Sequence, residues 1–397
     1  MRRRWLILAA GCLIQTILGG IYAWSTFVPY LMKTHDLTAG QCGFIFGVTI
    51  LTFTVSMIAA GRLLTRKGPR LTASVAACLF MSGYLLASVS GDSFPVLLLG
   101  VGVIAGAGIG FGYVCPLSVG MKWFPHKKGL VTGVVVAGFG GGAVLLATVA
   151  EYLLIEGMDV LVFFRWFGVC SGAVLFLAAS VLADPPSSGT GTQAFQAAAG
   201  AFTWPFFLIA TGMFAGTFAG LLIIGNLAPM VIKAGLTEGQ AAVSISVFAV
   251  GNAAGRIAWG HAFDGIGHKT MPLSLGGFAL TAGLLLTPLP VWGLFLCVGL
   301  LGFGFGANFV VYASAISRHF GASAFPRLYP WCFLAYGVAG LIGPGVGGYL
   351  ADVTASYTVP LYICVALVAA AASLLIINGH AFKRSAASLS GIRADTP

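Results

Sequence analysis

Long apolar runs recur along the whole chain, and they constrain its fold more than any other feature. Each run is about 20 residues long, which is enough for a helix to cross a hydrocarbon core of about 30 Å. Of the 397 residues, 58% are hydrophobic and only 8% are charged, whereas soluble domains carry about 25% charged residues. Because every backbone polar group must be bonded internally in a bilayer, these runs predict membrane-spanning helices.

Twelve spans are predicted from the apolar runs. Their expected ranges are 5–30, 41–62, 71–90, 95–121, 129–155, 160–182, 202–232, 240–263, 270–288, 291–317, 328–350 and 357–378. The segment 183–201 is rich in Pro, Ser and Gly, which is typical of a linker. We therefore expect an all-α membrane protein with one six-helix half at 1–182, a cytoplasmic linker at 183–201, and a second six-helix half with a short cytoplasmic tail at 202–397.

Lysine and arginine predict the orientation in the membrane. If the N-terminus is cytoplasmic, 16 of the 20 basic residues lie on the cytoplasmic side, Lys33 and Lys233 lie opposite, and Arg165 and Arg256 fall within spans. Basic clusters between apolar runs thus indicate topology and not a nucleic-acid partner. The start MRRRWLILAAGC resembles a signal peptide, but the apolar run continues to Tyr30. We expect a multi-pass protein of the inner membrane with both termini in the cytoplasm.

Cysteines and histidines give no sign of a reactive centre. All eight cysteines lie inside apolar runs without a CxxC pair, and all six histidines lie in loops or near span ends. This pattern predicts no disulfide framework, no metal site, no cofactor and no histidine proton relay. A polytopic sensor or a membrane enzyme is disfavoured, since no nucleophile, metal cluster or extramembrane catalytic domain is apparent. We expect a monomer.

Three motifs recur at nearly one offset. GRLLTRKGPR after span two and GHAFDGIGHK after span eight share the spacing G-x6-G-x-[RK], which pairs Gly61 with Gly260, Gly68 with Gly267 and Arg70 with Lys269. The glycine run at 106, 108 and 110 recurs at 302, 304 and 306, and VAGFGG recurs as VAGLIG. Such repetition indicates two duplicated, pseudo-symmetric halves. The glycine runs predict surfaces for helix packing and not a phosphate-binding loop, because no strand precedes them.

Two six-helix halves with a glycine-rich basic loop after spans two and eight resemble the major facilitator superfamily. The consensus of that loop is G-x3-D-x2-G-x-[RK]; the second copy keeps the acid as Asp264, whereas the first has Thr65. The resemblance implies that these loops govern conformational change, and the missing acid puts an acid-based latch on the N-terminal half in doubt. The loop residues concerned are Gly61, Arg62, Gly68, Arg70, Gly260, Asp264, Gly267 and Lys269.

Within the superfamily, the chain resembles the oxalate:formate antiporter family and its monocarboxylate-transporting relatives. The stretches that carry this resemblance are YAWSTF at 22–27, GAGIGFGY at 106–113, WFPHKKGLVTG at 123–133 and GNAAGR at 251–256. It implies a secondary transporter of small carboxylates that works by alternating access, with the halves rocking about a central site, and not an enzyme. A dicarboxylate exchanger and an exporter of another small anion or a drug are the alternatives.

Arg256 is the candidate ligand for the substrate. It lies eight residues before Asp264 in a run with no other charge, so a helix places it about 12 Å from that end. A central arginine costs roughly 2.5 to 3.5 kcal/mol on insertion scales and normally faces a watery cavity or a partner. Its planar fork matches a carboxylate, and the resemblance implies that role for an arginine in span eight. A structural ion pair is the alternative. For Arg165 we favour a structural role, because it lies close enough to the outer interface to extend its head group there or to pair with the nearby acids.

The resemblance also suggests the neighbours of Arg256. It places Tyr336 where the antiporter family has a lysine, which favours a monoanion such as lactate, pyruvate or formate over oxalate. Asn252 lies where the mammalian monocarboxylate transporters have an aspartate tied to protons, so proton-linked symport and anion exchange both stay open. Asn252, Asn308 and Tyr312 either line the cavity or bond across helices. The aromatic residues expected at the cavity are Tyr22, Trp24, Tyr113, Phe139 and Phe333.

Overall fold

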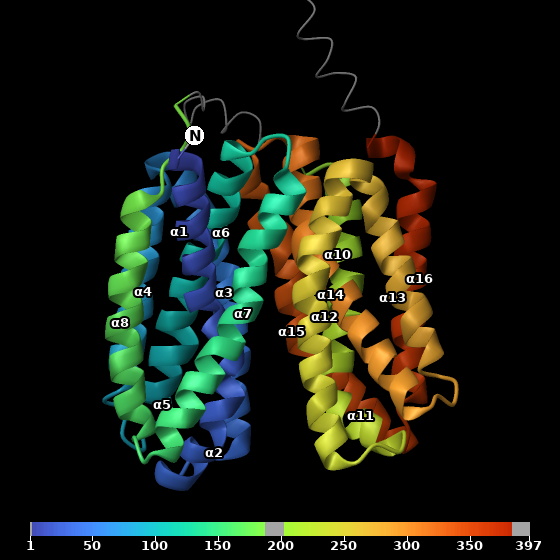
Figure 1. The fold of residues 1–397 in the computed structure, drawn as a ribbon, viewed down its shortest axis with the longest axis horizontal. Coiled ribbons are helices and arrows are strands. Elements are labelled where there is room, and N and C mark those ends of the chain that lie inside the picture. The colour runs from blue at the N-terminus through green and yellow to red at the C-terminus, as the bar shows by residue number, and fades with distance from the viewer. Residues whose placement is uncertain (1, 187–201, 383–397) are drawn as a thin grey trace, which may run out of the picture. The chain divides into compact units, whose positions relative to one another are not determined.

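The computed structural model describes residues 2–186 and 202–382, which contain helices and no strand (Figure 1). Residues 187–201 of the predicted linker and 383–397 of the predicted tail lie outside the described residues. Contacts divide the chain into two units. Unit 1 comprises Met1–Pro125 and Val134–Ala194, and unit 2 comprises His126–Gly133 and Phe195–Pro397.

The helices of unit 1 lie side by side as a bundle (Figure 1). In chain order they are α1 (Arg2–Gly19), the 3₁₀ turn η1 (Gly20–Ala23), α2 (Trp24–Thr34), α3 (Ala39–Lys67), α4 (Pro69–Ala87), α5 (Phe94–Leu97), the π-helical η2 (Leu98–Ala105), α6 (Gly106–Trp123), α7 (Lys128–Ile155) and α8 (Val160–Val181). The first turn and a half of α7 belongs to unit 2. The first span is therefore built from two helices joined at η1.

Unit 2 has a matching series of helices. They are α10 (Trp204–Gly225), α11 (Leu227–Lys233), α12 (Glu238–Ile266), η3 (Gly267–Lys269), α13 (Thr270–Leu284), α14 (Val291–Phe320), α15 (Phe325–Thr354), α16 (Thr358–Ile377) and η4 (Gly379–Phe382). Here α10 and α11 are separated by a break at Asn226, just as α1 and α2 are separated by η1.

Eleven helical segments in the described residues are long and apolar enough to cross a membrane. One of them, Gly239–Leu284, is 46 residues long and contains both α12 and α13. Predicted spans eight and nine correspond to α12 and α13, which the 3₁₀ turn η3 joins. The all-α, multi-pass membrane class is confirmed, although several helices run past the ends of their apolar runs.

Two capping boxes mark corresponding helix starts in the two units. Thr38 and Gln41 bond to each other's backbone at the start of α3, and Thr237 and Gln240 do the same at the start of α12. Each pair satisfies N–H groups that have no partner within the helix. The two boxes are 199 residues apart, which is the offset of the glycine-rich motif and adds a fourth sign of duplication.

The glycine-rich motifs were expected in loops, and the structure corrects this. Gly61 and Arg62 lie inside α3, and Gly260 and Asp264 lie inside α12. Both helices continue to the second glycine of the motif, where the backbone turns. These turning residues have positive φ, 83° at Gly68 and 62° at Gly267, a conformation that glycine adopts without steric cost.

Helices α12 and α14 pack backbone against backbone through glycines on both sides. A Cβ at Gly251 or Gly255 would overlap the carbonyl groups of Gly299 or Phe303, and a Cβ at Gly302 or Gly306 would overlap those of Phe248 or Asn252. In α6, glycines 106 and 110 meet α3 in the same way. Small residues allow such close approach in membranes, so the prediction that the glycine runs are packing surfaces is confirmed.

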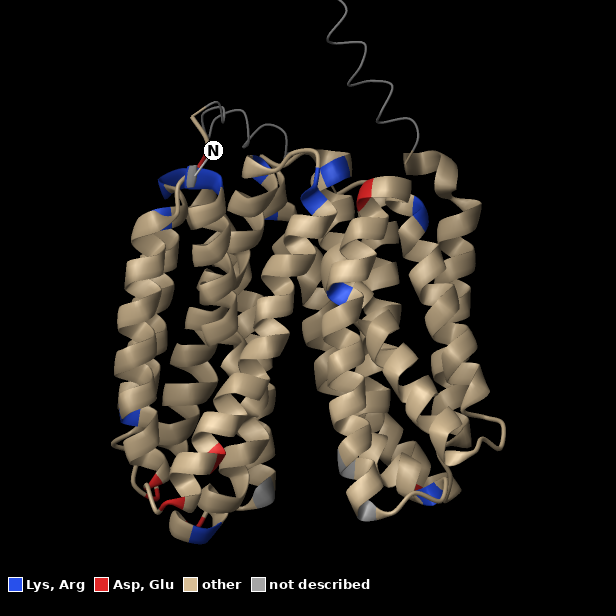
Figure 2. Ribbon diagram, viewed as in Figure 1, with Lys and Arg blue, Asp and Glu red and all other residues tan. Residues whose placement is uncertain are grey.

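Basic residues at one end of unit 1 bind the residues that follow the end of α8. Lys122 Nζ lies 2.8 Å from Asp184 Oδ2, and the Trp123 indole N–H donates to the Ala183 carbonyl at 2.7 Å. Arg70, the basic residue of the first glycine-rich motif, donates to the Leu182 carbonyl. Figure 2 shows the basic residues of this unit gathered mainly at this end and acidic residues mainly at the other.

Candidate functional site

Arg256 is buried within α12, with 2% of its surface exposed. It lies ten residues before the end of α12 at Ile266, about 15 Å along the axis. Arg256 is the only Lys or Arg of α12, so the blue stretch within that helix in Figure 2 marks its position. The structure thus places Arg256 deep within its span, as the sequence predicts.

Two uncharged neighbours orient the Arg256 side chain. Asn252, one turn earlier on α12, accepts a hydrogen bond from Nε at 3.0 Å. The guanidinium carbon lies 4.6 Å from the centre of the Phe309 ring on α14, within the range of a cation–π interaction. Both contacts fix the plane of the guanidinium without neutralising its charge.

Phe309 connects Arg256 to the predicted residues of α15. Its ring centre lies 5.4 Å from that of Tyr336 and 6.4 Å from that of Phe333. Tyr336 and Phe333 are themselves 5.1 Å apart, and all three aromatic side chains are buried. Four predicted residues, Asn252, Arg256, Phe333 and Tyr336, thus come together in unit 2 around a ring that the sequence did not single out.

Asn308 and Tyr312 of α14 face a different helix. Their side chains lie against Gly216 and Gly212 of α10, where a Cβ would collide with them. Both residues are almost fully buried, and the Asn308 amide donates to its own helix at Phe305 O. The structure packs both side chains against α10, and their role in lining the cavity or bonding across helices stays a prediction.

A second aromatic cluster lies in unit 1 and contains three predicted residues. Phe139 of α7 lies 5.5 Å from Tyr22 in η1 and 5.3 Å from Tyr113 of α6. Phe53 of α3 completes the cluster at 5.2 Å from Tyr113. Gln15 of α1 donates to the Tyr113 carbonyl at 3.1 Å, so four spans meet here.

Trp24 packs elsewhere in unit 1. Its ring is stacked on Phe164 of α8 at 6.3 Å, and it contacts Phe27 at the same distance. Its indole N–H donates to the Cys42 carbonyl at 2.9 Å. These bonds tie α2 to α3 and α8, and they do not bring Trp24 to the cluster of Tyr22, Tyr113 and Phe139.

Asp264 binds the start of α7, within unit 2. Its two carboxylate oxygens accept hydrogen bonds from the backbone N–H groups of Gly129 and Leu130, at 2.8 and 2.9 Å. These N–H groups have no partner within α7, and the positive end of the helix dipole favours an anion. The acid of the second glycine-rich motif therefore caps another helix.

The first turns of α7 also pack closely on α12. Gly129 and Gly260 approach so closely that a Cβ on either would overlap the backbone of the other, and Gly133 meets the carbonyl of Arg256 in the same way. Lys128 Nζ donates to the Ser317 carbonyl of α14 at 3.3 Å. The stretch WFPHKKGLVTG thus supplies the two glycines that this contact requires.

The first glycine-rich motif makes no such bond with its equivalent residue. Thr65, which takes the place of the acid, donates instead to the Gly61 carbonyl within α3 at 2.8 Å. Arg62 and Lys269 are exposed. Gly267 turns beside the guanidinium of Arg318, and Arg318 lies over the Phe263 ring at 5.8 Å.

Replacing Asp264 by asparagine is expected to lower the free energy of unfolding by about 2 kcal/mol. Asparagine offers one acceptor oxygen where the carboxylate offers two, and it removes the negative charge at the helix start. The thermal midpoint of the purified protein measures this loss. Asp352, an exposed acid of α15, is the matched control, and its change to asparagine should leave the midpoint unchanged. Equal midpoints for both variants would contradict the assignment.

Arg165 is exposed on α8, close to the end that follows Asp159. The Asp159 carboxylate accepts hydrogen bonds from Leu161 and Val162 and faces His35. No hydrogen bond or ion pair of Arg165 is found among the described residues. An exposed arginine near a span end can extend its head group to the interface, in line with the structural interpretation.

Comparison with known proteins covers nearly the whole chain. Residues 8–230 and 208–391 match the model of the Major Facilitator Superfamily. The chain is 27% identical to the uncharacterized MFS-type transporter YhjX of Escherichia coli (strain K12), over 86% of each chain. It is 26% identical to the oxalate:formate antiporter of Oxalobacter formigenes, over 88% of this chain and 85% of the antiporter. It is 25% identical to apicoplast pyruvate carrier 1 of Toxoplasma gondii, over 84% and 81%.

Solved structures agree on the fold. The crystal structure of the transporter FucP in the outward conformation superposes with a TM-score of 0.69, covering 92% of this chain and 98% of FucP at 16% identity. The proton:xylose symporter XylE superposes with a TM-score of 0.72 at 14% identity, covering 94% and 95%. Together with the helical architecture and the family match, this shows that the chain belongs to the Major Facilitator Superfamily, whose members are transporters and not enzymes.

Proposed function

We propose that this protein is a secondary transporter of small monocarboxylate anions, such as lactate, pyruvate and formate, and that Arg256 binds the carboxylate. The observation that carries the proposal is a guanidinium buried within α12, whose Nε donates to Asn252 and whose face lies over the Phe309 ring. The names of an oxalate:formate antiporter and a pyruvate carrier among the relatives support the same class of substrate.

The geometry of Arg256 suits a carboxylate. With Nε bonded to Asn252, the edge of the guanidinium that meets the substrate would be the one formed by the two Nη atoms. That edge can donate two parallel hydrogen bonds to the two oxygens of one carboxylate. The aromatic rings of Phe309 and Phe333 would then contact the short apolar part of the anion.

The residues around Arg256 favour a single negative charge. Tyr336 is buried in contact with Phe309 and Phe333, and its hydroxyl can donate a hydrogen bond but carries no charge. One buried cation balances a monoanion, whereas a dianion would keep a buried charge uncompensated. We therefore propose monocarboxylates over oxalate.

Other predicted residues take supporting roles in this proposal. Tyr22, Tyr113 and Phe139 would line the substrate pathway from unit 1, since they form one cluster across three spans. Asn308 and Tyr312 would support α14 on α10. The bond between Asp264 and the start of α7 would be made and broken as the transporter alternates between inward and outward access.

The coupling follows from the buried charge. A bound carboxylate would offset part of the cost of burying the Arg256 guanidinium when the site closes, and we therefore propose exchange of anions. Asn252 does not titrate, and proton-linked symport would need the proton to travel with the substrate or on another group. We propose a monomer in the inner membrane, with the basic ends of the bundles in the cytoplasm.

Uptake into reconstituted vesicles tests this function. Labelled lactate, formate and oxalate are offered with and without an internal anion and with and without a pH gradient. We expect uptake of the monocarboxylates to exceed that of oxalate. Dependence on an internal anion would establish exchange, and dependence on the gradient would establish symport. Uptake of none of the three would overturn the proposal.

Phe309 gives a finer test. Replacing it by leucine removes the cation–π contact, worth about 0.5 to 2 kcal/mol, and should raise the KM for a monocarboxylate about 3- to 30-fold with a smaller change in kcat. The matched control is Phe278, a buried phenylalanine of α13 that packs on Gly304 of α14. If Phe278→Leu raises the KM equally, Phe309 acts through packing alone and the assigned role is wrong.

A further inference from the structure

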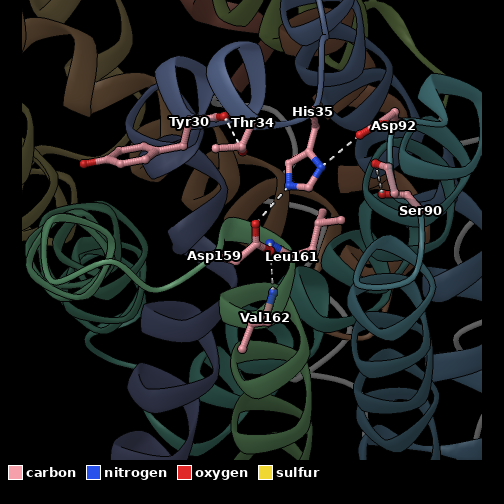
Figure 3. A network of polar contacts seen from close by, with 9 residues as sticks. Tyr30, Thr34, His35, Ser90, Asp92, Asp159, Leu161 and Val162 are labelled. Atoms are coloured by element: carbon pink, nitrogen blue, oxygen red, sulfur yellow. Dashed lines mark hydrogen bonds and ion pairs between the residues drawn. The ribbon is translucent and has the colours of Figure 1, made fainter.

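His35 lies between two acids that come from different connections of unit 1 (Figure 3). Its Nδ1 lies 3.3 Å from Asp92 Oδ1 in the α4–α5 connection, and its Nε2 lies 3.2 Å from Asp159 Oδ2 in the α7–α8 connection. His35 itself follows the last residue of α2. One imidazole ring thus joins three segments that are far apart in the sequence.

Only the form of the ring that carries two N–H groups can bond both acids at once. A neutral imidazole has one N–H and one lone pair, so it can donate to only one carboxylate and would turn a lone pair toward the other. The imidazolium donates to both. The His35 side chain is 11% exposed, whereas those of Asp92 and Asp159 are 71% and 41% exposed, so the acids remain solvated while the ring is enclosed.

Asp159 is held in place by the start of its own helix. The other oxygen of Asp159 accepts from the backbone N–H groups of Leu161 and Val162 and caps α8. Asp36, next to His35, has φ of 48°, a left-handed conformation that aspartate tolerates. The remaining charged groups of these segments are Lys33, Asp36 and Glu156, and none of them forms a hydrogen bond or ion pair with the ring in the described part of the chain.

The ring lies at the far end of a jointed span. The 3₁₀ turn η1 separates α2 from α1, and Tyr22 within it contacts Phe139. Inward of His35, α2 is attached through its buried side chains Trp24, Phe27 and Leu31. We infer that His35 is a proton-operated clasp. When the ring is protonated, it ties the end of α2 to both connections. When the ring is neutral, it releases one of them, so that α2 can pivot about η1.

The corresponding helix end in unit 2 carries a permanent cation. Lys233 ends α11 and donates to the Ala355 carbonyl in the α15–α16 connection at 3.3 Å, with its ammonium 5.3 Å from the centre of the Tyr357 ring. This arrangement also ties a short half-helix to the connection before the last span of the unit. Since lysine keeps its charge where histidine loses it, the clasp responds to pH in unit 1 alone.

Hydrogen exchange of the full chain in lipid nanodiscs tests the clasp at about pH 5.5 and about pH 8, where histidine changes charge. After correction for intrinsic rates, we expect the peptides that contain the last turn of α2 and residues 90–93 to exchange at least threefold faster at the higher pH. The peptide of α11 is the internal control and should not respond. Because no substrate is added, failure of this test leaves the proposed transport activity untouched.

Three variants make the result decisive. In His35→Gln, the peptides with the last turn of α2 and residues 90–93 should exchange at both pH values as fast as they do in the unmodified protein at the higher pH. In Asp92→Asn, most of the difference between the two pH values should be lost. Asp36→Asn, which changes an adjacent exposed acid and keeps the turn, should retain it. Equal exchange of α2 at both pH values in the unmodified protein, or an undiminished response in His35→Gln, would overturn the clasp.

Discussion

Replacing Arg256 by glutamine is expected to reduce the initial rate of monocarboxylate uptake at least 100-fold. The change removes the charge and the fork that would donate two charge-assisted hydrogen bonds, together worth about 3 kcal/mol or more in a dry site. Arg256→Lys keeps the charge but not the planar fork, and we expect it to retain about 1 to 10% of the rate. Vesicle uptake measures both, with the thermal midpoint and elution profile showing that each variant is folded.

Arg165 provides the matched control for this experiment. It is the other arginine within a predicted span, but it is exposed on α8. Arg165→Gln should therefore leave the uptake rate within about twofold of the unmodified protein, because its side chain can be solvated at the interface. If Arg256→Gln also folds and transports at that rate, the assignment of the carboxylate to Arg256 is wrong.

Replacing Tyr336 by lysine is expected to shift the preference from lactate toward oxalate by about tenfold or more. A second cation beside Arg256 would balance a dianion and would stay uncompensated with a monoanion. The ratio of kcat/KM for the two anions measures the shift. Lactate uptake itself should fall, since the added ammonium is then buried without a partner.

Tyr336→Phe tests the hydroxyl group alone at the same position. It removes only the hydroxyl, so we expect weaker lactate binding by about 3- to 10-fold, the value of one hydrogen bond, with the preference over oxalate retained. An unchanged preference in Tyr336→Lys would show that Tyr336 does not lie beside the bound anion. The role of Arg256 would then be tested by Arg256→Gln and Arg256→Lys alone.

Local sequence properties predicted much of the fold. Span positions follow from apolar runs of fixed length, and the deep position of Arg256 follows from counting residues along one helix. The glycine spacing in α12 and α14 predicted close packing, since only small residues allow carbonyl contact. The ends of helices were less predictable, because backbone hydrogen bonding carries α3 and α12 to Gly68 and Gly267 beyond their apolar runs.

Contacts between distant segments could not be predicted in this way. Phe309 is one of 30 phenylalanines, and only the packing of α14 on α12 brings it beneath Arg256. The His35 clasp joins residues 57 and 124 positions apart. A signal for Tyr312 was present, however: Gly212, Gly216 and Gly220 recur every four residues on α10, and that row receives the side chains of α14.

Binding of pyruvate to the purified protein tests the central claim most directly, because it requires no transport cycle. Calorimetric titration at fixed ionic strength is carried out on the unmodified protein and on Arg256→Gln, with pyruvamide as an uncharged analogue of the ligand. We predict saturable binding of pyruvate to the unmodified protein, at least 30-fold weaker binding to the variant, about 2 kcal/mol, and no binding of pyruvamide to either. Equal affinity of the two proteins for pyruvate would contradict the claim that Arg256 binds the carboxylate.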